Sequence, residues 1–113
     1  MSITRIEPGA RMSQAVVHGN TVYLAGQVAA GATVAEQTKG ILAQIDALLQ
    51  RAGTDKSKLL SATIWLTDIS TFAEMNGVWE AWVSPGNPPA RATVEAKLAA
   101  PEYRVEIGVI AAV

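Results

Sequence analysis

YRVEIGVI, residues 103–110, is apolar on both of its alternating faces except at Arg104 and Glu106. A segment of this kind is typical of a strand at the centre of a sheet, or of a strand that a neighbouring subunit covers. We therefore predict a final strand from about Tyr103 to Ala112. An ionised carboxylate buried there without a partner would cost several kcal/mol. Glu106 should accordingly be paired, exposed at a subunit boundary, or used in chemistry.

Arg91 is the first candidate partner of Glu106. It follows two prolines in PPARATV, residues 88–94, and these prolines fix the backbone that presents its guanidinium group. Residues 91–98 alternate with period two and predict a half-buried strand. Its polar face would carry Arg91, Thr93, Glu95 and Lys97, and its apolar face Ala92, Val94, Ala96 and Leu98.

A simple hairpin between the last two strands would set Arg91 opposite Gly108 and diagonal to Glu106 on the polar face. That register would leave room above Gly108 for a small ligand between the guanidinium and the carboxylate. Two other interpretations stay open. Arg91 is an ordinary exposed arginine in one of them, and in the other Glu106 forms a structural ion pair with Arg104, Arg91 or Lys97.

The first half of the chain predicts a hairpin followed by a helix. Within residues 16–28, two β-branched or aromatic runs flank a Gly-Asn pair, the usual sign of a tight turn. Thr33 and Glu36 then form a possible capping box. Apolar residues at helical spacing continue from there until Gly53, where we expect the helix to end.

The second half predicts a strand, a helix and two further strands. Residues 59–67 are too few and too β-branched for a helix, and we expect a strand that ends at Asp68. Thr71 and Glu74 form a second possible capping box ahead of a helix that residues 84–86, Ser-Pro-Gly, terminate. The resulting order, ββαβαββ, indicates a single α+β domain over residues 1–113. Two helices would pack on one face of a mixed sheet, and partner subunits would cover the other face.

Composition favours a homo-oligomer and argues against some classes of partner. Half of the 113 residues are hydrophobic, so we expect other subunits to cover part of the apolar surface. The net charge is −1 and lysine and arginine are dispersed, unlike the basic patch of a nucleic-acid-binding protein. The N-terminal segment lacks a signal-peptide core, and no apolar run approaches the ~18 residues of a membrane span. We expect a cytoplasmic protein without nucleic-acid or membrane partners.

Side chains that often carry catalysis or bind metals are scarce. The chain has no cysteine, and its one histidine, His18, lies in a predicted turn. We therefore expect no metal site and no thiol or serine-histidine catalysis. No glycine pattern resembles a phosphate-binding loop. Core positions are expected for Trp65 and for the helical stripe of Phe72, Met75, Trp79 and Trp82.

Five short motifs occur together in this sequence. They are GN at residues 19–20, AGQV at 25–28, FAEMN at 72–76, PARATV at 89–94 and VEI at 105–107. With these motifs the chain resembles, over nearly its whole length, the reactive intermediate deaminase family (Rid, or YjgF-like proteins), some of which were formerly named endoribonucleases. The segment from the proline to the glutamate is the most specific part of the resemblance.

The resemblance implies a chorismate-mutase-like fold assembled as a homotrimer, with sites in clefts between subunits and no cofactor. It also implies that the strand of residues 60–66 separates the last two strands, and this topology takes precedence over the hairpin register. The implied activity is hydrolysis of enamine and imine intermediates, such as 2-aminoacrylate, to a 2-oxo acid and ammonia. An imine is already electrophilic, so orienting it beside a water supplies much of the catalysis.

The same resemblance assigns roles to individual residues. Arg91 would bind the substrate carboxylate, and Glu106 would hold and polarise the attacking water. Backbone groups near Thr93 and Gly26 would complete the pocket. The implied substrate-binding set is Gly26, Asn76, Arg91, Ala92 and Thr93.

Two positions depart from the family pattern. The best-known deaminases of the family carry a tyrosine in the N-terminal segment and a serine before the Gly-Gln pair, where this chain has Met12 and Ala25. Arg11 and Ser13 are the candidates to compensate. The chain therefore resembles a divergent subgroup, whose preferred imine the sequence does not identify.

Two other functions stay open. A trimer of this kind could bind or sense a small carboxylate without turnover, although Glu106 beside the ligand would repel an anion. Endoribonuclease activity ranks last, because the acidic balance and the scarcity of aromatic residues outside the helices do not suit RNA.

Overall fold

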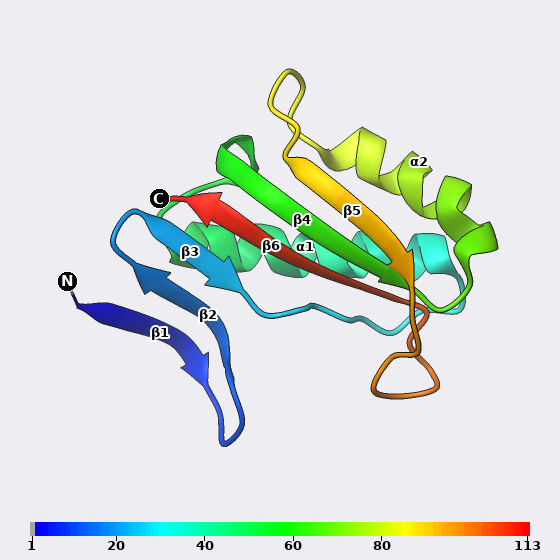
Figure 1. The fold of residues 1–113 in the computed structure, drawn as a ribbon, viewed down its shortest axis with the longest axis horizontal. Helices are drawn as coiled ribbons and strands as arrows, with labels where there is room; N and C mark the ends of the chain where they lie inside the picture. The colour runs from blue at the N-terminus through cyan, green and yellow to red at the C-terminus, as the bar shows by residue number, and fades with distance from the viewer. Residues whose placement is uncertain (1) are drawn as a thin grey trace.

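The computed structural model describes residues 2–113 and contains six strands and two α-helices within them. Figure 1 shows their arrangement. The strands are β1 (Ile3–Pro8), β2 (Ser13–His18), β3 (Thr21–Leu24), β4 (Leu59–Leu66), β5 (Ala90–Glu95) and β6 (Val105–Ala112). The helices are α1 (Val34–Arg51) and α2 (Phe72–Trp82), with short 3₁₀ turns η1 (Lys56–Lys58) and η2 (Ile69–Thr71).

The strands of the described residues form one mixed sheet in the order β1-β2-β3-β6-β4-β5. The last strand, β6, is central as predicted, and it pairs antiparallel with β3 and β4. Helix α2 connects β4 to β5, which makes those two strands parallel and places β4 between β5 and β6. The hairpin register is therefore wrong, because Arg91 pairs with Ala62 and Gly108 pairs with Thr63.

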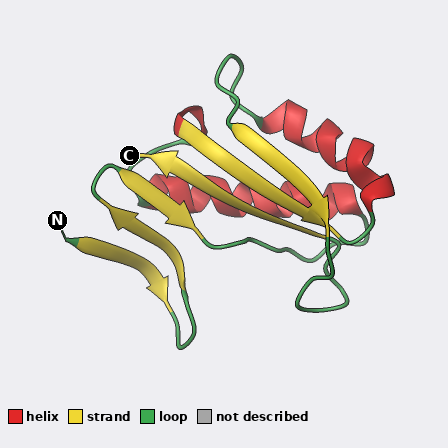
Figure 2. Cartoon of the chain, viewed as in Figure 1, coloured by secondary structure: helices red, strands yellow, loops and turns green. Residues whose placement is uncertain are grey.

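Both helices pack on one face of the sheet, as predicted (Figure 2). The core lies between this face and the helices, and burying each large apolar side chain there contributes roughly 1.5–3 kcal/mol. Among its fully buried members are Ile41, Ile45 and Leu49 of α1, Ile64 and Leu66 of β4, and Ile107 of β6. No helix within residues 2–113 has the length and apolarity needed to cross a bilayer.

Helix α1 begins and ends as the sequence predicts. The Thr33 hydroxyl accepts a hydrogen bond from the backbone N–H of Glu36 at 3.1 Å, and the Glu36 carboxylate accepts one from the N–H of Ala32 at 2.9 Å. Gly53 follows the helix with φ of +87°, a left-handed conformation that favours glycine.

The predicted capping box of α2 is wrong. The Thr71 side chain caps no helical N–H, because its hydroxyl donates to the carbonyl of Asp68. The Asp68 carboxylate caps the preceding 3₁₀ turn instead, accepting from the N–H of Ser70 at 2.9 Å. The Glu74 carboxylate accepts from the N–H of Ala35 at 2.9 Å and so connects α2 to the first turn of α1.

Strand β1 was not predicted. Only Ile6 of its six residues is buried, so its apolar alternation is too weak to indicate a strand. The face prediction for β5 is also wrong. Arg91 and Thr93 lie half-buried on the helix face, whereas Ala92 and Val94 lie exposed on the opposite face. As an edge strand, β5 has no cover for that apolar face within one chain.

The sheet face opposite the helices, here called the open face, is uncovered in a single chain. Its apolar side chains include Tyr23, Trp65, Val94 and Ile110, and Val94 is 46% exposed. Trp65 is half-buried on this face, so its predicted place in the core is wrong. Several apolar side chains left uncovered on one sheet face are typical of a protein interface.

Candidate functional site

Glu106 lies on the open face of the central strand. It alternates with Val105 and Ile107, whose side chains are fully buried on the helix face. Trp65 is its cross-strand neighbour on β4, so the carboxylate and the indole lie side by side. The ion pair found among residues 2–113 joins two other side chains. The Glu106 carboxylate therefore has no cationic partner in the described chain.

Gly26 lies directly against the Glu106 carboxylate. A Cβ placed on Gly26 would be 2.0 Å from Oε2 of Glu106, so any larger residue would displace that carboxylate. The next residue, Gln27, exchanges backbone hydrogen bonds with Ile107, at 2.8 Å through its N–H and 3.1 Å through its carbonyl. This bridge holds the Gly-Gln motif beside β6.

The Gln27 side chain also fixes this loop. Its buried amide donates to the Gln14 carbonyl oxygen Oε1 and to the Ala25 backbone carbonyl, both at 3.0 Å. Strand β2 is thereby tied to the segment that carries Gly26. Neither Gln14 nor Gln27 was predicted to form this contact, although two glutamines on either side of a predicted hairpin turn are a usable signal for such a pair.

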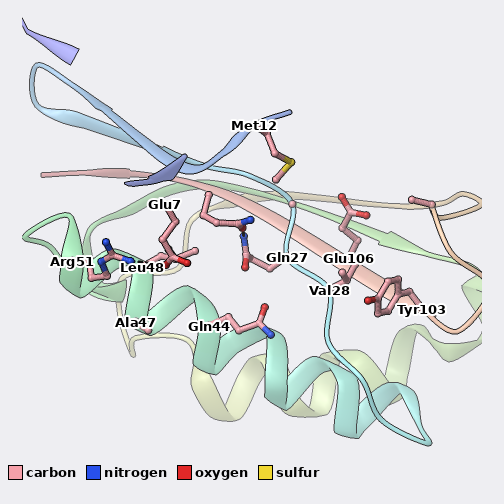
Figure 3. A pocket seen from close by; sticks show the side chains of 13 residues that line it. Glu7, Met12, Gln27, Val28, Gln44, Ala47, Leu48, Arg51, Tyr103 and Glu106 are labelled. Atoms are coloured by element: carbon pink, nitrogen blue, oxygen red, sulfur yellow. Dashed lines mark hydrogen bonds and ion pairs between the residues drawn. The ribbon is translucent and has the colours of Figure 1, made fainter. Parts of the chain in front are cut away.

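An open cavity of about 620 Å³ lies beside Glu106 (Figure 3). Its lining includes Met12, Gly26 and Tyr103 together with Gln44, Ala47, Leu48 and Arg51 of α1. Figure 3 shows the side chains of Met12 and Glu106 on the side of the sheet away from α1. Met12 is 49% exposed there and presents only apolar atoms. The proposed substitutes, Arg11 and Ser13, do not line this cavity.

Arg91 lies on the helix face of β5. Its neighbour on β4 is the buried Ala62. Its guanidinium carbon is 5.7 Å from the ring centre of Phe72 and 5.5 Å from that of Trp79, within the range of cation–π contacts. Trp79 is buried as predicted, but Phe72 is 38% exposed and so is not a core residue. No carboxylate of residues 2–113 pairs with Arg91, which leaves its N–H groups able to bind an anion.

Two buried polar atoms in this region lack hydrogen-bond partners, Oδ1 of Asn76 and Oγ1 of Thr93. Asn76 lies one helical turn from both Phe72 and Trp79, the two rings that contact Arg91. Thr93 is two residues beyond Arg91 on the same face of β5. An unpaired buried polar atom costs about 1–3 kcal/mol. This cluster is therefore incomplete within one chain.

The predicted site residues thus form two separate groups. Gly26 and Glu106 lie on the open face, and Arg91, Asn76 and Thr93 lie on the helix side of β5. Ala92 faces the open side of that strand. Strand β4 separates the groups by two strand spacings, about 10 Å. The expectation that one polar face carries both Arg91 and Glu106 is wrong. Among the described residues, no three histidine, aspartate or glutamate side chains gather as metal ligands.

A family model described as Endoribonuclease L-PSP matches residues 2–113. This chain belongs to the YjgF/Rid family. Its relatives in that family include the RutC family protein YoaB of Escherichia coli strain K12, which is 49% identical over 114 residues that cover 100% of both chains.

Solved structures of YjgF/Rid proteins confirm the predicted α+β fold class. A YjgF family member from Neisseria meningitidis superimposes with a TM-score of 0.97 at 50% identity, covering 99% of this chain and 95% of that chain. A Rid family protein from Yersinia pestis superimposes with a TM-score of 0.92 at 31% identity, covering 99% of this chain and 100% of that chain.

Proposed function

We propose that this protein hydrolyses 2-imino acids, and the enamines that tautomerise to them, to 2-oxo acids and ammonia. 2-Aminoacrylate and related intermediates are the substrate class. Arg91 binds the substrate carboxylate, and Glu106 positions and polarises the attacking water. The observation that carries the proposal is that both charged groups lack an ionic partner among residues 2–113. Each is nevertheless held in place, Arg91 by two aromatic rings and Glu106 by contact with Gly26.

The chemistry requires orientation and one proton carrier. The water oxygen forms a bond to the imine carbon, and the π electrons of the C=N bond move to nitrogen. Glu106 accepts a proton from the water and delivers it to that nitrogen. The C–N bond then breaks, the second water proton leaves with the nitrogen as ammonia, and the carbonyl of the 2-oxo acid forms. No cofactor takes part.

A complete site of this kind needs two subunits. In one chain, Arg91 and Glu106 face opposite sides of the sheet, so a substrate of a few carbon atoms cannot contact both. In a homotrimer, the β5 edge of one subunit lies beside the open face of the next, and Arg91 approaches the second subunit's carboxylate. The uncovered apolar open face supports this assembly.

Thr93 and Asn76 complete the carboxylate-binding end. The Thr93 hydroxyl donates to the substrate carboxylate, and Oδ1 of Asn76 accepts an N–H from the Arg91 guanidinium when the ligand is bound. The absence of hydrogen-bond partners for both atoms in the single chain supports this assignment. Binding then satisfies two polar groups that are otherwise unpaired.

The experiment generates an imine in situ from an amino acid with a flavin oxidase and follows its loss. Wild type, Arg91→Ala and Glu106→Gln are compared at equal concentration. We expect Arg91→Ala mainly to raise KM and Glu106→Gln mainly to lower kcat. Equal rates for all three proteins would exclude hydrolysis at this site. If wild type binds 2-oxo acids through Arg91 but turns over no imine, the protein is a carboxylate binder.

A further inference from the structure

Gly108 lies in the middle of the central strand, where neither its backbone conformation nor a close neighbour in the described chain requires glycine. Glycine weakens a strand interior, because it loses more conformational freedom than other residues and packs no side chain. Its φ is not in the left-handed region. A Cβ placed there would lie 3.6 and 3.7 Å from two ring carbons of Trp65 and 3.8 Å from the Gly26 Cα, all ordinary contact distances. Alanine would therefore fit without displacing a neighbour.

This bare backbone lies beside the candidate catalytic carboxylate. Gly108 follows Glu106 by two residues and faces the same side of the sheet. Trp65 leans from β4 over this bare backbone, and Gly26 borders it from the other side. We call the surface formed by Gly26, Trp65 and Gly108 the Trp65 subsite. Its members present an indole ring and two glycine backbones.

We propose that the Trp65 subsite holds the apolar side chain of the substrate, so that the protein prefers 2-imino acids whose side chain has several carbon atoms. This inference rests on the proposed function of the Glu106 site. An aromatic ring beside bare backbone provides contact area for a hydrocarbon chain. Met12 is exposed on the same side of the sheet and adds a flexible apolar group beside Glu106, at the neighbouring cavity that Trp65 and Gly108 do not line.

A substrate fits this space better than a second protein chain does. A partner backbone packed flat on Gly108 would also cover Glu106, whose carboxylate has no cationic partner in the described chain. Burying that charge dry would be strongly unfavourable. A small substrate leaves room for the attacking water beside the Glu106 carboxylate, which therefore stays hydrated. The negative charge of Glu106 and the apolar subsite can then lie side by side.

The test compares imines made from L-leucine and L-alanine with wild type, Gly108→Ala and a control, Gly77→Ala. Gly77 is exposed on α2, and a Cβ there meets nothing within 4 Å. We expect wild type to favour the leucine-derived imine. The methyl group of Gly108→Ala should lower kcat/KM for that imine about tenfold and change the alanine-derived value by less than about twofold. Gly77→Ala should match wild type, and light scattering should give all three proteins the same mass.

A binding measurement separates this inference from the enzymatic proposal. 4-Methyl-2-oxopentanoate should quench tryptophan fluorescence in wild type, and Trp65→Phe should lose more of this quenching than Trp82→Phe, while Trp79 beside Arg91 accounts for the remainder. If no imine is hydrolysed and this quenching is still weakened by Gly108→Ala, the subsite stands and the enzymatic function fails. The subsite would be overturned if Gly108→Ala lost kcat/KM equally on both imines or on neither. A light-scattering mass smaller than that of wild type would overturn it as well.

Discussion

Gly26 and Glu106 are so close that a Cβ on the glycine would lie 2.0 Å from the carboxylate oxygen Oε2. The carboxylate is the end of a flexible, half-buried side chain, so Gly26→Ala should rotate it away without unfolding the protein. A displacement of about 1 Å can cost roughly a hundredfold in rate. We expect kcat to fall by that order while the melting temperature changes little. Stopped-flow assays of imine loss and calorimetry measure the two quantities.

Gly77→Ala is the matched control for this substitution, since it adds the same methyl group in open space. It should keep wild-type kcat. A Gly26→Ala protein with wild-type kcat would show that the position of the Glu106 carboxylate does not limit the reaction.

Mixing two impaired variants, at a substrate concentration below the wild-type KM, tests whether the site spans two subunits. Arg91→Ala and Glu106→Gln chains, unfolded together at equal amounts and refolded, should form mixed trimers in which roughly one quarter of the sites carry both native groups. We expect activity to return to about that fraction of wild type. Separately refolded variants, combined without exchange, serve as the control. No recovery in trimers shown by mass spectrometry to be mixed would contradict a shared site.

The Gln37 side chain stabilises the loop before β6. It is 1% exposed, its amide donates to the carbonyls of Gly31 and Glu102, and its Oε1 accepts from the N–H of Arg104. Gln37→Leu keeps the volume but removes all three bonds, so the free energy of unfolding should fall by about 2–3 kcal/mol. Urea denaturation measures it, with the exposed Gln50→Leu as control. Equal values for the two variants would exclude this role.

The Asp68 carboxyl group should titrate at unusually low pH. The Ser70 hydroxyl and then its N–H, at 2.7 and 2.9 Å, hold the pKa of Asp68 below its ordinary value of 3.8, although desolvation opposes them. A carboxyl whose pKa is lowered by folding stabilises the fold above its unfolded pKa, and this stabilisation is lost as pH falls through the folded value. Ser70→Ala should raise the pKa of Asp68, as carbon-detected NMR titration can measure. Ser57→Ala should leave it unchanged.

Elements with strong local patterns were predictable from the sequence. The apolar run around Glu106 identified the central strand, and Thr33 and Gly53 marked the two ends of α1. Strand β1 lacked such a pattern, because it packs through Ile6 alone. Strand β6 and helix α1 could be predicted because their local sequence patterns are sufficient without knowledge of distant contacts.

The candidate site was only partly predictable, because its geometry depends on distant pairings. Arg91 was assigned to a solvent-facing polar side, yet its guanidinium group lies over the rings of Phe72 and Trp79 of α2. Trp65 was assigned to the core because tryptophan usually is buried. The pairing of β4 with both β5 and β6 decides these faces, and no local periodicity encodes it.

Because the sheet lies between Arg91 and Glu106, the amount of active protein depends on how many chains are associated. A folded but dissociated chain would hold only half of the proposed site on each face and would hydrolyse nothing. Specific activity should therefore fall on dilution below the dissociation constant of the assembly. A ligand that bridges two chains favours their association by mass action. Substrate would then increase the concentration of the species that consumes it.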